Sequence, residues 1–262
     1  MAVVLSWNVA GRVRSVAQQA AALAQRPADV VALQEVRATA ATAWEGELRA
    51  LGFEHVAVTL PAGGAQRPPE RRLGVLIASH QPLQLGPELR IPWPERHLAV
   101  FTDVDGVPTE IHNLHAPISS KAELAKVLTL EAMYEHLITV GETPRVLVGD
   151  LNTPQYESRE GEVRSFARTR AGAIRPTHGE RHDRAELALI VGLRDAGYRD
   201  AFREVHGYSR RDRSWLYPNG KMGWRLDHVI TRGLGVTDCE YEHSWREQRL
   251  SDHSAIWAEL TA

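Results

Sequence analysis

Six apolar runs of this sequence end in, or lie next to, a carboxylate, a carboxamide or an imidazole. Buried groups of these types are tolerated only when they pair with one another or bind a metal ion. If the runs are strands that meet at one edge of a sheet, the side chains can converge on one cation. The groups are Asn8, Glu35, His115, Asp150 with Asn152, Asp227 with His228, and Asp252 with His253.

The donor atoms of this set are mostly oxygens, and this decides the kind of cation. The chain has one cysteine, Cys239, and few of its histidines are clustered in the sequence. Carboxylate and amide oxygens favour hard cations, so the set suits Mg²⁺ or Mn²⁺ better than Zn²⁺. The chemistry that follows is metal-assisted attack of water on a phosphorus centre.

Each group also has a purely structural explanation. Asn8 could cap a turn, Asp150 could form an Asx turn before Pro154, and His115 could be a core imidazole bonded to the backbone. Taken one at a time, the structural explanations of Asn8 and Asp150 are as good as the catalytic one, and that of His115 is the better one. Chance placement of all six groups together is a poor explanation.

Length and composition predict one domain over residues 1–262, since 262 residues can enclose one large core. The first eight residues have no basic region, and their apolar run is too short for a signal peptide or a membrane span. We expect a cytoplasmic protein with no membrane contact, and a monomer by default. Cys239 cannot form an intramolecular disulfide and is expected to be buried as an apolar residue.

The formal net charge of −2 argues against indiscriminate nucleic-acid binding through bulk charge. Any contact with nucleic acid must therefore come from a local patch. Arginines gather between positions 159 and 213, and they are explained equally well as a phosphate-facing patch or as solvated loop and helix faces.

Apolar periodicity predicts the elements that must position these groups. Strand, helix, strand and helix open the chain and consecutive strands fill its middle, which favours two mixed sheets packed face to face with helices outside. A capping box formed by Ser120 and Glu123 marks the start of the third helix. The predicted strands are 3–7, 30–33, 73–78, 98–104, 109–114, 145–148, 226–231 and 255–260; the helices 16–25, 42–51, 121–139 and 184–196; the loops 60–71, 92–96 and 156–184.

In this order and spacing, the motifs resemble the exonuclease III and abasic-endonuclease branch of the endonuclease/exonuclease/phosphatase superfamily, over nearly the whole chain. The resemblance implies a four-layer α/β sandwich of the deoxyribonuclease I type, with the site at one edge. The matching pieces are Ser6-Trp7-Asn8-Val9, Leu33-Gln34-Glu35, Asn113-Leu114-His115, Gly149-Asp150-Leu151-Asn152, Gly223-Trp224-Arg225-Leu226-Asp227 and Ser251-Asp252-His253.

The resemblance also implies catalytic roles. Asp150 and Asn152 match residues that orient or deprotonate the attacking water, and His253 matches a histidine that a carboxylate holds, here Asp227. A carboxylate behind an imidazole fixes its tautomer and favours its protonated form. His115 would join them in stabilising charge on the phosphate oxygens, and the expected product carries a 3′-hydroxyl.

For the metal, the resemblance implies Glu35 as the main Mg²⁺ ligand, with Asp252 and Asn8 nearby. Arg37 stands where the family usually has lysine, so it would bind substrate through a fork rather than a point charge. Further substrate contacts are implied for Trp215, Trp224 and Leu226, because this segment is similar to the one that shapes the abasic-sugar pocket in DNA repair members. Trp224 could equally be a core residue. The expected substrate is a DNA duplex with an abasic or 3′-blocked site.

Two residues depart from the family pattern, and the second of them, with the net charge of −2, keeps an alternative open. Ala10 stands where repair members commonly carry Asp or Asn, and His115 stands where they usually carry tyrosine. Deoxyribonuclease I and the phosphatase-like branches often have histidine there, so the alternative is a phosphodiesterase or phosphatase for a small-molecule or lipid-headgroup substrate. A binding protein without chemistry is disfavoured, because Glu35, Asp150 and His253 are all present.

Overall fold

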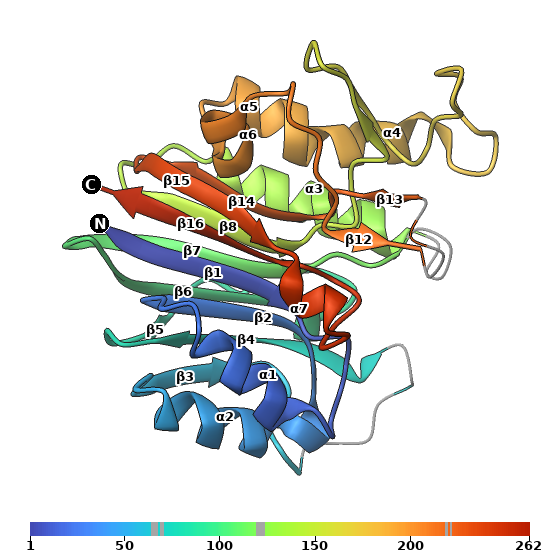
Figure 1. The fold of residues 1–262 in the computed structure, drawn as a ribbon. Helices are drawn as coiled ribbons and strands as arrows, with labels where there is room; N and C mark the ends of the chain where they lie inside the picture. Colours follow the sequence, from blue (N-terminus) through green and yellow to red (C-terminus); the bar gives the residue numbers. More distant parts are fainter. Residues whose placement is uncertain (64–67, 69–70, 119–123, 218–219, 221) are drawn as a thin grey trace.

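Two six-stranded mixed β-sheets lie face to face at the centre of the molecule (Figure 1). The computed structural model describes residues 1–63, 68, 71–118, 124–217, 220 and 222–262. The first sheet has the order β15 (Gly235–Glu242), β16 (Ala255–Thr261), β1 (Ala2–Asn8), β2 (Val30–Arg37), β4 (Leu73–Ser79), β3 (His55–Val58). The second has the order β11 (Arg199–Asp200), β14 (Asp227–Arg232), β8 (Arg145–Asp150), β7 (Val107–His115), β6 (His97–Val104), β5 (Gln84–Leu85).

Helices cover the outer face of each sheet, which gives four layers. Helices α1 (Val16–Leu23) and α2 (Ala41–Ala50) cover the first sheet, and α3 (Ala125–Leu137) and α4 (Gly179–Leu187) cover the second (Figure 1). This arrangement confirms the predicted deoxyribonuclease I-like sandwich. The shorter elements are η1 (Ala38–Ala40), η3 (Pro94–Arg96), the π-helical turn η4 (Ala188–Gly192), α5 (Leu193–Asp195), α6 (Ala201–His206) and α7 (Ser244–Glu247). No helix in the described ranges combines the length and apolar character needed to cross a membrane.

Alternation of side chains along the strands explains the layers. On β1, Val4 belongs to the core between the sheets, while Leu5 and Trp7 pack on the helical side of the first sheet. On β8, Val148 faces the other sheet and Leu147 packs in the cluster under α3. Both faces of these central strands are buried, which is why they read as continuous apolar runs.

All eight predicted strands are confirmed, although β2 runs four residues further than predicted. The helix predicted at 184–196 begins five residues earlier, at Gly179, and its first turns are charged rather than apolar, which hid them from periodicity. The predicted loop 156–184 was therefore wrong in part. It contains these turns and the ribbon β9 (Tyr156–Glu157) with β10 (Val163–Arg164). The predicted loop 92–96 contains η3.

Other elements carried weak sequence signals. The edge strands β3 and β15 were not predicted, nor was the ribbon β12 (Trp215–Leu216) with β13 (Gly223–Trp224). Cys239 on β15 is buried and free, as expected. The capping box of Ser120 and Glu123 falls outside the described residues.

Candidate active site

The candidate site lies where strands of both sheets meet at one edge of the sandwich. Strands β1 and β2 are parallel, as are β7 and β8, so Asn8, Glu35, His115 and Asp150 are carried to the same edge. Strand β14 is antiparallel to β8 and places its first residue, Asp227, opposite Asp150. Asp227 therefore begins its strand and reaches the same edge as Asp150.

Glu35 is aimed at the site by an irregularity within β2. The register with β4 shifts between Gln34 and Val36, and Glu35 has a φ of 59°. Such a bulge turns a side chain out of the regular alternation, at a cost in backbone strain. The amide Nδ2 of Asn8 donates to Glu35 Oε1 at 3.2 Å and to Asp150 Oδ2 at 3.1 Å. One amide thus holds two carboxylates together.

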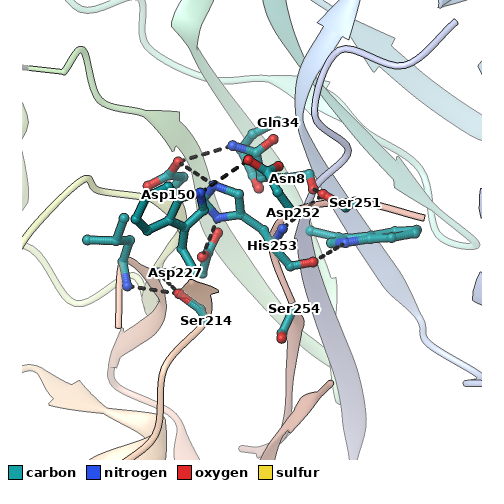
Figure 2. Close-up of polar contacts among 12 residues, drawn as sticks. Asn8, Gln34, Asp150, Ser214, Asp227, Ser251, Asp252, His253 and Ser254 are labelled. Carbon is teal, nitrogen blue, oxygen red and sulfur yellow. Dashed lines mark hydrogen bonds and ion pairs between the residues drawn. The ribbon is translucent and has the colours of Figure 1, made fainter. Parts of the chain in front are cut away.

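His253 lies between Asp150 and Asp227 (Figure 2). Its Nδ1 is 2.8 Å from Asp227 Oδ2, and its Nε2 is 3.8 Å from Asp150 Oδ2. Burial lowers the pKa of His253, but the carboxylates of Asp227, Asp150 and Asp252 outweigh burial and raise it to about 10. The ring is therefore an imidazolium at neutral pH, with Nδ1 fixed as a donor to Asp227.

At Asp150 burial, and not a neighbouring charge, has the largest effect on the pKa. Burial, helped by Asp227 and opposed by His253, raises the pKa of Asp150 to about 7. Its Oδ1 accepts a hydrogen bond from the backbone N–H of Asn152 at 2.9 Å, and Asn152 Nδ2 donates to the Ala116 carbonyl at 2.8 Å. A carboxyl with a pKa near neutrality can act as a proton acceptor at physiological pH.

His115 is a neutral group inside the same cluster. Its Nε2 lies 3.6 Å from Glu35 Oε1, 3.9 Å from Asp150 Oδ2 and 3.4 Å from Arg96 Nη1. Burial, together with the charges of Arg96 and His253, lowers the pKa of His115 well below its ordinary value. The ring can therefore exchange hydrogen bonds at the site without adding charge. Arg96 was not predicted from the sequence.

The donor set fits a hard divalent cation. Burial raises the pKa of Glu35, although the charge of His253 opposes this effect. The pKa of Asp150 is raised as well. The half-buried carboxylate of Glu35 and the buried carboxylate of Asp150 carry negative charge that their neighbours do not fully compensate, and a cation would compensate it. Asp252 lies on the rim, where its Oδ2 accepts a hydrogen bond from Trp215 Nε1 at 3.1 Å.

A cavity of about 550 Å³ opens beside these groups, and its other wall is aromatic. Trp215 and Trp224 are stacked, with centroids 5.3 Å apart and planes 7° apart. Tyr217 packs edge-on against both indoles, and Phe166 packs edge-on against Trp224. The cavity therefore pairs charged groups on one side with flat apolar rings on the other.

Eleven of the twelve predicted site residues are brought to this edge, and Arg37 is not among the cavity-lining residues. Its Nε donates instead to the Gly11 carbonyl at 2.7 Å. His228, the neighbour of Asp227, also points away, because consecutive strand residues face opposite sides. Its ring nitrogens contact Asp200 Oδ2 at 3.1 Å and the Thr153 carbonyl at 2.9 Å.

Most of the clustered arginines have structural partners. Arg168 pairs with Asp183, and Arg203 pairs with Glu157. Among the described arginines between 159 and 213, Arg175 is the one that lines the cavity. Most arginines of this segment are therefore explained as parts of solvated, ion-paired loop and helix faces.

Lys126 is a cavity residue that sequence reasoning missed. Its side chain is buried, and its Nζ donates to the Asn152 carbonyl at 2.7 Å and to Glu186 Oε1 at 2.6 Å. The available signal was a single lysine inside an apolar helical stretch. Tyr217 and Phe166 were also missed, and Tyr217 had a signal in its position two residues after Trp215.

Residues 5–253 match the model of the Endonuclease/Exonuclease/phosphatase family, and the chain belongs to this family. This confirms the predicted superfamily and identifies the chain as a phosphoester hydrolase of a family whose enzymes depend on divalent metals. No curated protein matches the chain.

Many solved structures share the fold, and three of them are compared with this chain below. An AP endonuclease from Archaeoglobus fulgidus is 21% identical, with a TM-score of 0.72 over 98% of each chain. The 3′ phosphatase NExo from Neisseria, bound to a product DNA hairpin, is 20% identical, with a TM-score of 0.69 over 100% of each chain. TDP2 from D. rerio, complexed with a single-strand DNA product, is 15% identical, with a TM-score of 0.72 over 100% of this chain and 99% of that one.

Proposed function

We propose that this chain is a Mg²⁺-dependent or Mn²⁺-dependent phosphodiesterase that cleaves DNA at abasic or 3′-blocked sites. Residues 1–262 would act as a single catalytic domain in a monomer. The observation that carries the proposal is the imidazolium of His253 between Asp227 and Asp150, at the floor of a cavity with a stacked aromatic wall. The DNA-bound NExo and the AP endonuclease, which share the fold, support DNA as the substrate.

In this proposal Glu35 holds the cation, with Asn8 and Asp252 beside it. A divalent cation held there would withdraw charge from the phosphate and lower the pKa of a coordinated water. The protein side chains contribute the rest of the chemistry, and the closeness of Glu35 Oε1 to the Asn8 amide keeps that carboxylate turned into the site.

Proton transfer falls to Asp150 and His253. Asp150, with a pKa of about 7, takes the proton of the attacking water. His253 is held as an imidazolium, and its Nε2 donates to a non-bridging phosphate oxygen as charge develops there. Asn152 and His115 line the cavity beside these groups and orient the phosphate and the water. Attack of the water on phosphorus breaks the P–O3′ bond, and the leaving 3′-oxygen takes a proton from solvent. The products carry a 3′-hydroxyl and a 5′-phosphate.

The aromatic wall selects the sugar or base ring next to the scissile phosphate. Trp215 is held in place by its hydrogen bond to Asp252 and by its stack on Trp224. The buried side chain of Leu226 completes the apolar surface. A flat apolar wall accepts the face of a ring while leaving the phosphate in the charged half of the cavity.

A second candidate function is hydrolysis of a small-molecule or lipid-headgroup phosphoester at the same site. Two observations favour it. The buried His115 replaces the tyrosine usual in the repair branch, and a cavity of about 550 Å³ is large enough to enclose a small ligand.

One experiment separates the two candidates. The protein is incubated with an abasic-site duplex, and separately with a chromogenic phosphodiester, in Mg²⁺, in Mn²⁺ and after chelation. We expect Trp224→Ala to lower abasic-site cleavage by roughly 10-fold or more and to leave the chromogenic rate unchanged. Tyr208→Ala, at a half-buried aromatic residue outside the cavity lining, is the control. Unchanged abasic-site cleavage in Trp224→Ala would favour the second candidate, and metal-independent hydrolysis would refute both.

A further inference from the structure

A second cluster of polar side chains lies between the second sheet and helix α3. Glu110 and His112 come from β7, His97 from β6 and His136 from α3. Along β7, a rise of about 3.3 Å per residue puts His112 roughly 10 Å from His115. The cluster is therefore separate from the catalytic groups.

Three donor atoms of this cluster meet at distances that suit one metal ion. Glu110 Oε1 lies 3.2 Å from His112 Nε2 and 2.8 Å from His136 Nε2. All three atoms lie within 4.8 Å of one another. In a tetrahedral zinc site with bonds of about 2.0–2.1 Å, ligand atoms are about 3.3 Å apart. Small side-chain movements would bring the three atoms to that spacing.

The neighbouring groups orient these donors. His97 Nε2 lies 3.0 Å from His112 Nδ1, so that contact takes one ring nitrogen and turns the other toward Glu110. Although buried, His112 Nε2 makes no well-formed hydrogen bond with any residue that the structure describes. Arg145 Nε donates to Glu110 Oε2 at 2.8 Å, which leaves Oε1 for the cluster. Metal-binding histidines commonly use their second nitrogen for such an outer contact.

Protonation states agree with this arrangement. Burial lowers the pKa values of His97 and His112, so both rings are neutral at pH 7. Burial alone would raise the pKa of Glu110, but the nearby side chains of His112, His136 and Arg145 hold it well below the ordinary value. Neutral imidazoles beside an ionised carboxylate are the forms that bind a transition metal.

We propose that Glu110, His112 and His136 form a binding site for a divalent transition-metal ion of the Zn²⁺ type. Two imidazoles and one carboxylate favour such an ion over Mg²⁺. The His136 side chain is 20% exposed and offers the route from solvent. The ion would join α3 to β7, and it would thereby stabilise the helix whose Lys126 lines the cavity.

The test is a calorimetric titration with Zn²⁺ in an excess of Mg²⁺, so that the oxygen-rich catalytic site is occupied. We expect one tight Zn²⁺ site in the wild type and in Glu35→Gln, and a melting temperature that Zn²⁺ raises in both. His136→Ala should weaken this binding by on the order of 100-fold or more. His55→Ala, at a half-buried histidine on β3, should bind as the wild type does.

Crystals soaked in Zn²⁺ give a readout that does not depend on a variant. The expected result is an anomalous difference peak between Glu110, His112 and His136. Two results overturn the proposal: equal Zn²⁺ affinity in His136→Ala and the wild type, or an anomalous peak at the catalytic groups with none at this cluster.

Discussion

Replacing Asp227 with asparagine removes one negative charge and almost no volume from behind His253. The two side chains are buried and 2.8 Å apart, so the charge acts in a setting with little screening by water. Asp227 has the largest effect of the three carboxylates, Asp227, Asp150 and Asp252, that raise the pKa of His253 from 6.5 to about 10. That rise of about 3.5 pKa units corresponds to a net preference of about 5 kcal/mol for the imidazolium.

In Asp227→Asn we expect the pKa of His253 to fall toward 6.5. Burial lowers this pKa, and the charge of Asp227 would no longer oppose that effect. Above neutral pH the ring becomes neutral, and its tautomer is no longer fixed by a carboxylate. Turnover at pH 8 should drop by roughly 10²–10⁴-fold. The loss should become smaller at lower pH, because the ring of His253 is then protonated again. This holds down to the pH at which Asp150 itself takes up a proton.

Two measurements check this reasoning. Cleavage of an abasic-site duplex is followed from pH 6 to 10, and the ring of His253 is titrated by NMR. Asp212→Asn is the matched control, because Asp212 Oδ1 pairs with His243 Nε2 at 2.8 Å outside the catalytic groups, and its rate should match the wild type. An unchanged pKa for His253, or a wild-type rate at pH 8, would refute the role given to Asp227.

Three further predictions follow from the same geometry. Wild-type turnover should rise as the pH passes through about 7, where Asp150 loses its proton, and fall above about 10, where His253 loses its own; a rate that declines between pH 6 and 8 contradicts this order. Glu35→Gln should abolish turnover and the rise in melting temperature that Mg²⁺ produces. Without metal it should be at least as stable as the wild type at pH 7, since a carboxyl whose pKa is raised by burial destabilises the fold when ionised; a lower melting temperature would count against this. Gly149→Ala should lower the free energy of unfolding, measured by chemical denaturation, by at least about 3 kcal/mol. The new Cβ would lie 2.0 Å from the Leu114 carbonyl oxygen, at a φ of 130°. The control Gly46→Ala, in open space on α2, should raise the free energy of unfolding by up to about 1 kcal/mol.

Local signals in the chain were enough to predict the central strands of both sheets and most of the candidate site residues. Strand periodicity is a property of neighbouring residues, so runs such as β1 and β8 could be read directly. Polar residues next to such runs were a reliable guide to Asn8, Asp150 and His253, because a buried polar group needs a partner wherever it lies. The candidate site, and the chemistry proposed for it, could therefore be inferred from residue types and order.

The tertiary structure decided which of these side chains face one another. Glu35 reaches the site through a bulge, Arg37 is drawn to the Gly11 carbonyl, and Arg96 contacts His115 from a turn far along the chain. No pattern of neighbouring residues encodes these contacts.

The second cluster, too, is formed by the packing of elements that are distant in the sequence. His97, His112 and His136 are separated by 15 and 24 positions in the sequence, and they meet because β6, β7 and α3 pack together. Residue types and local periodicity can be read from the sequence itself. The distances between residues far apart in the sequence are set only when the layers pack. The same packing brings together the charges that determine the pKa values of His253 and Asp150.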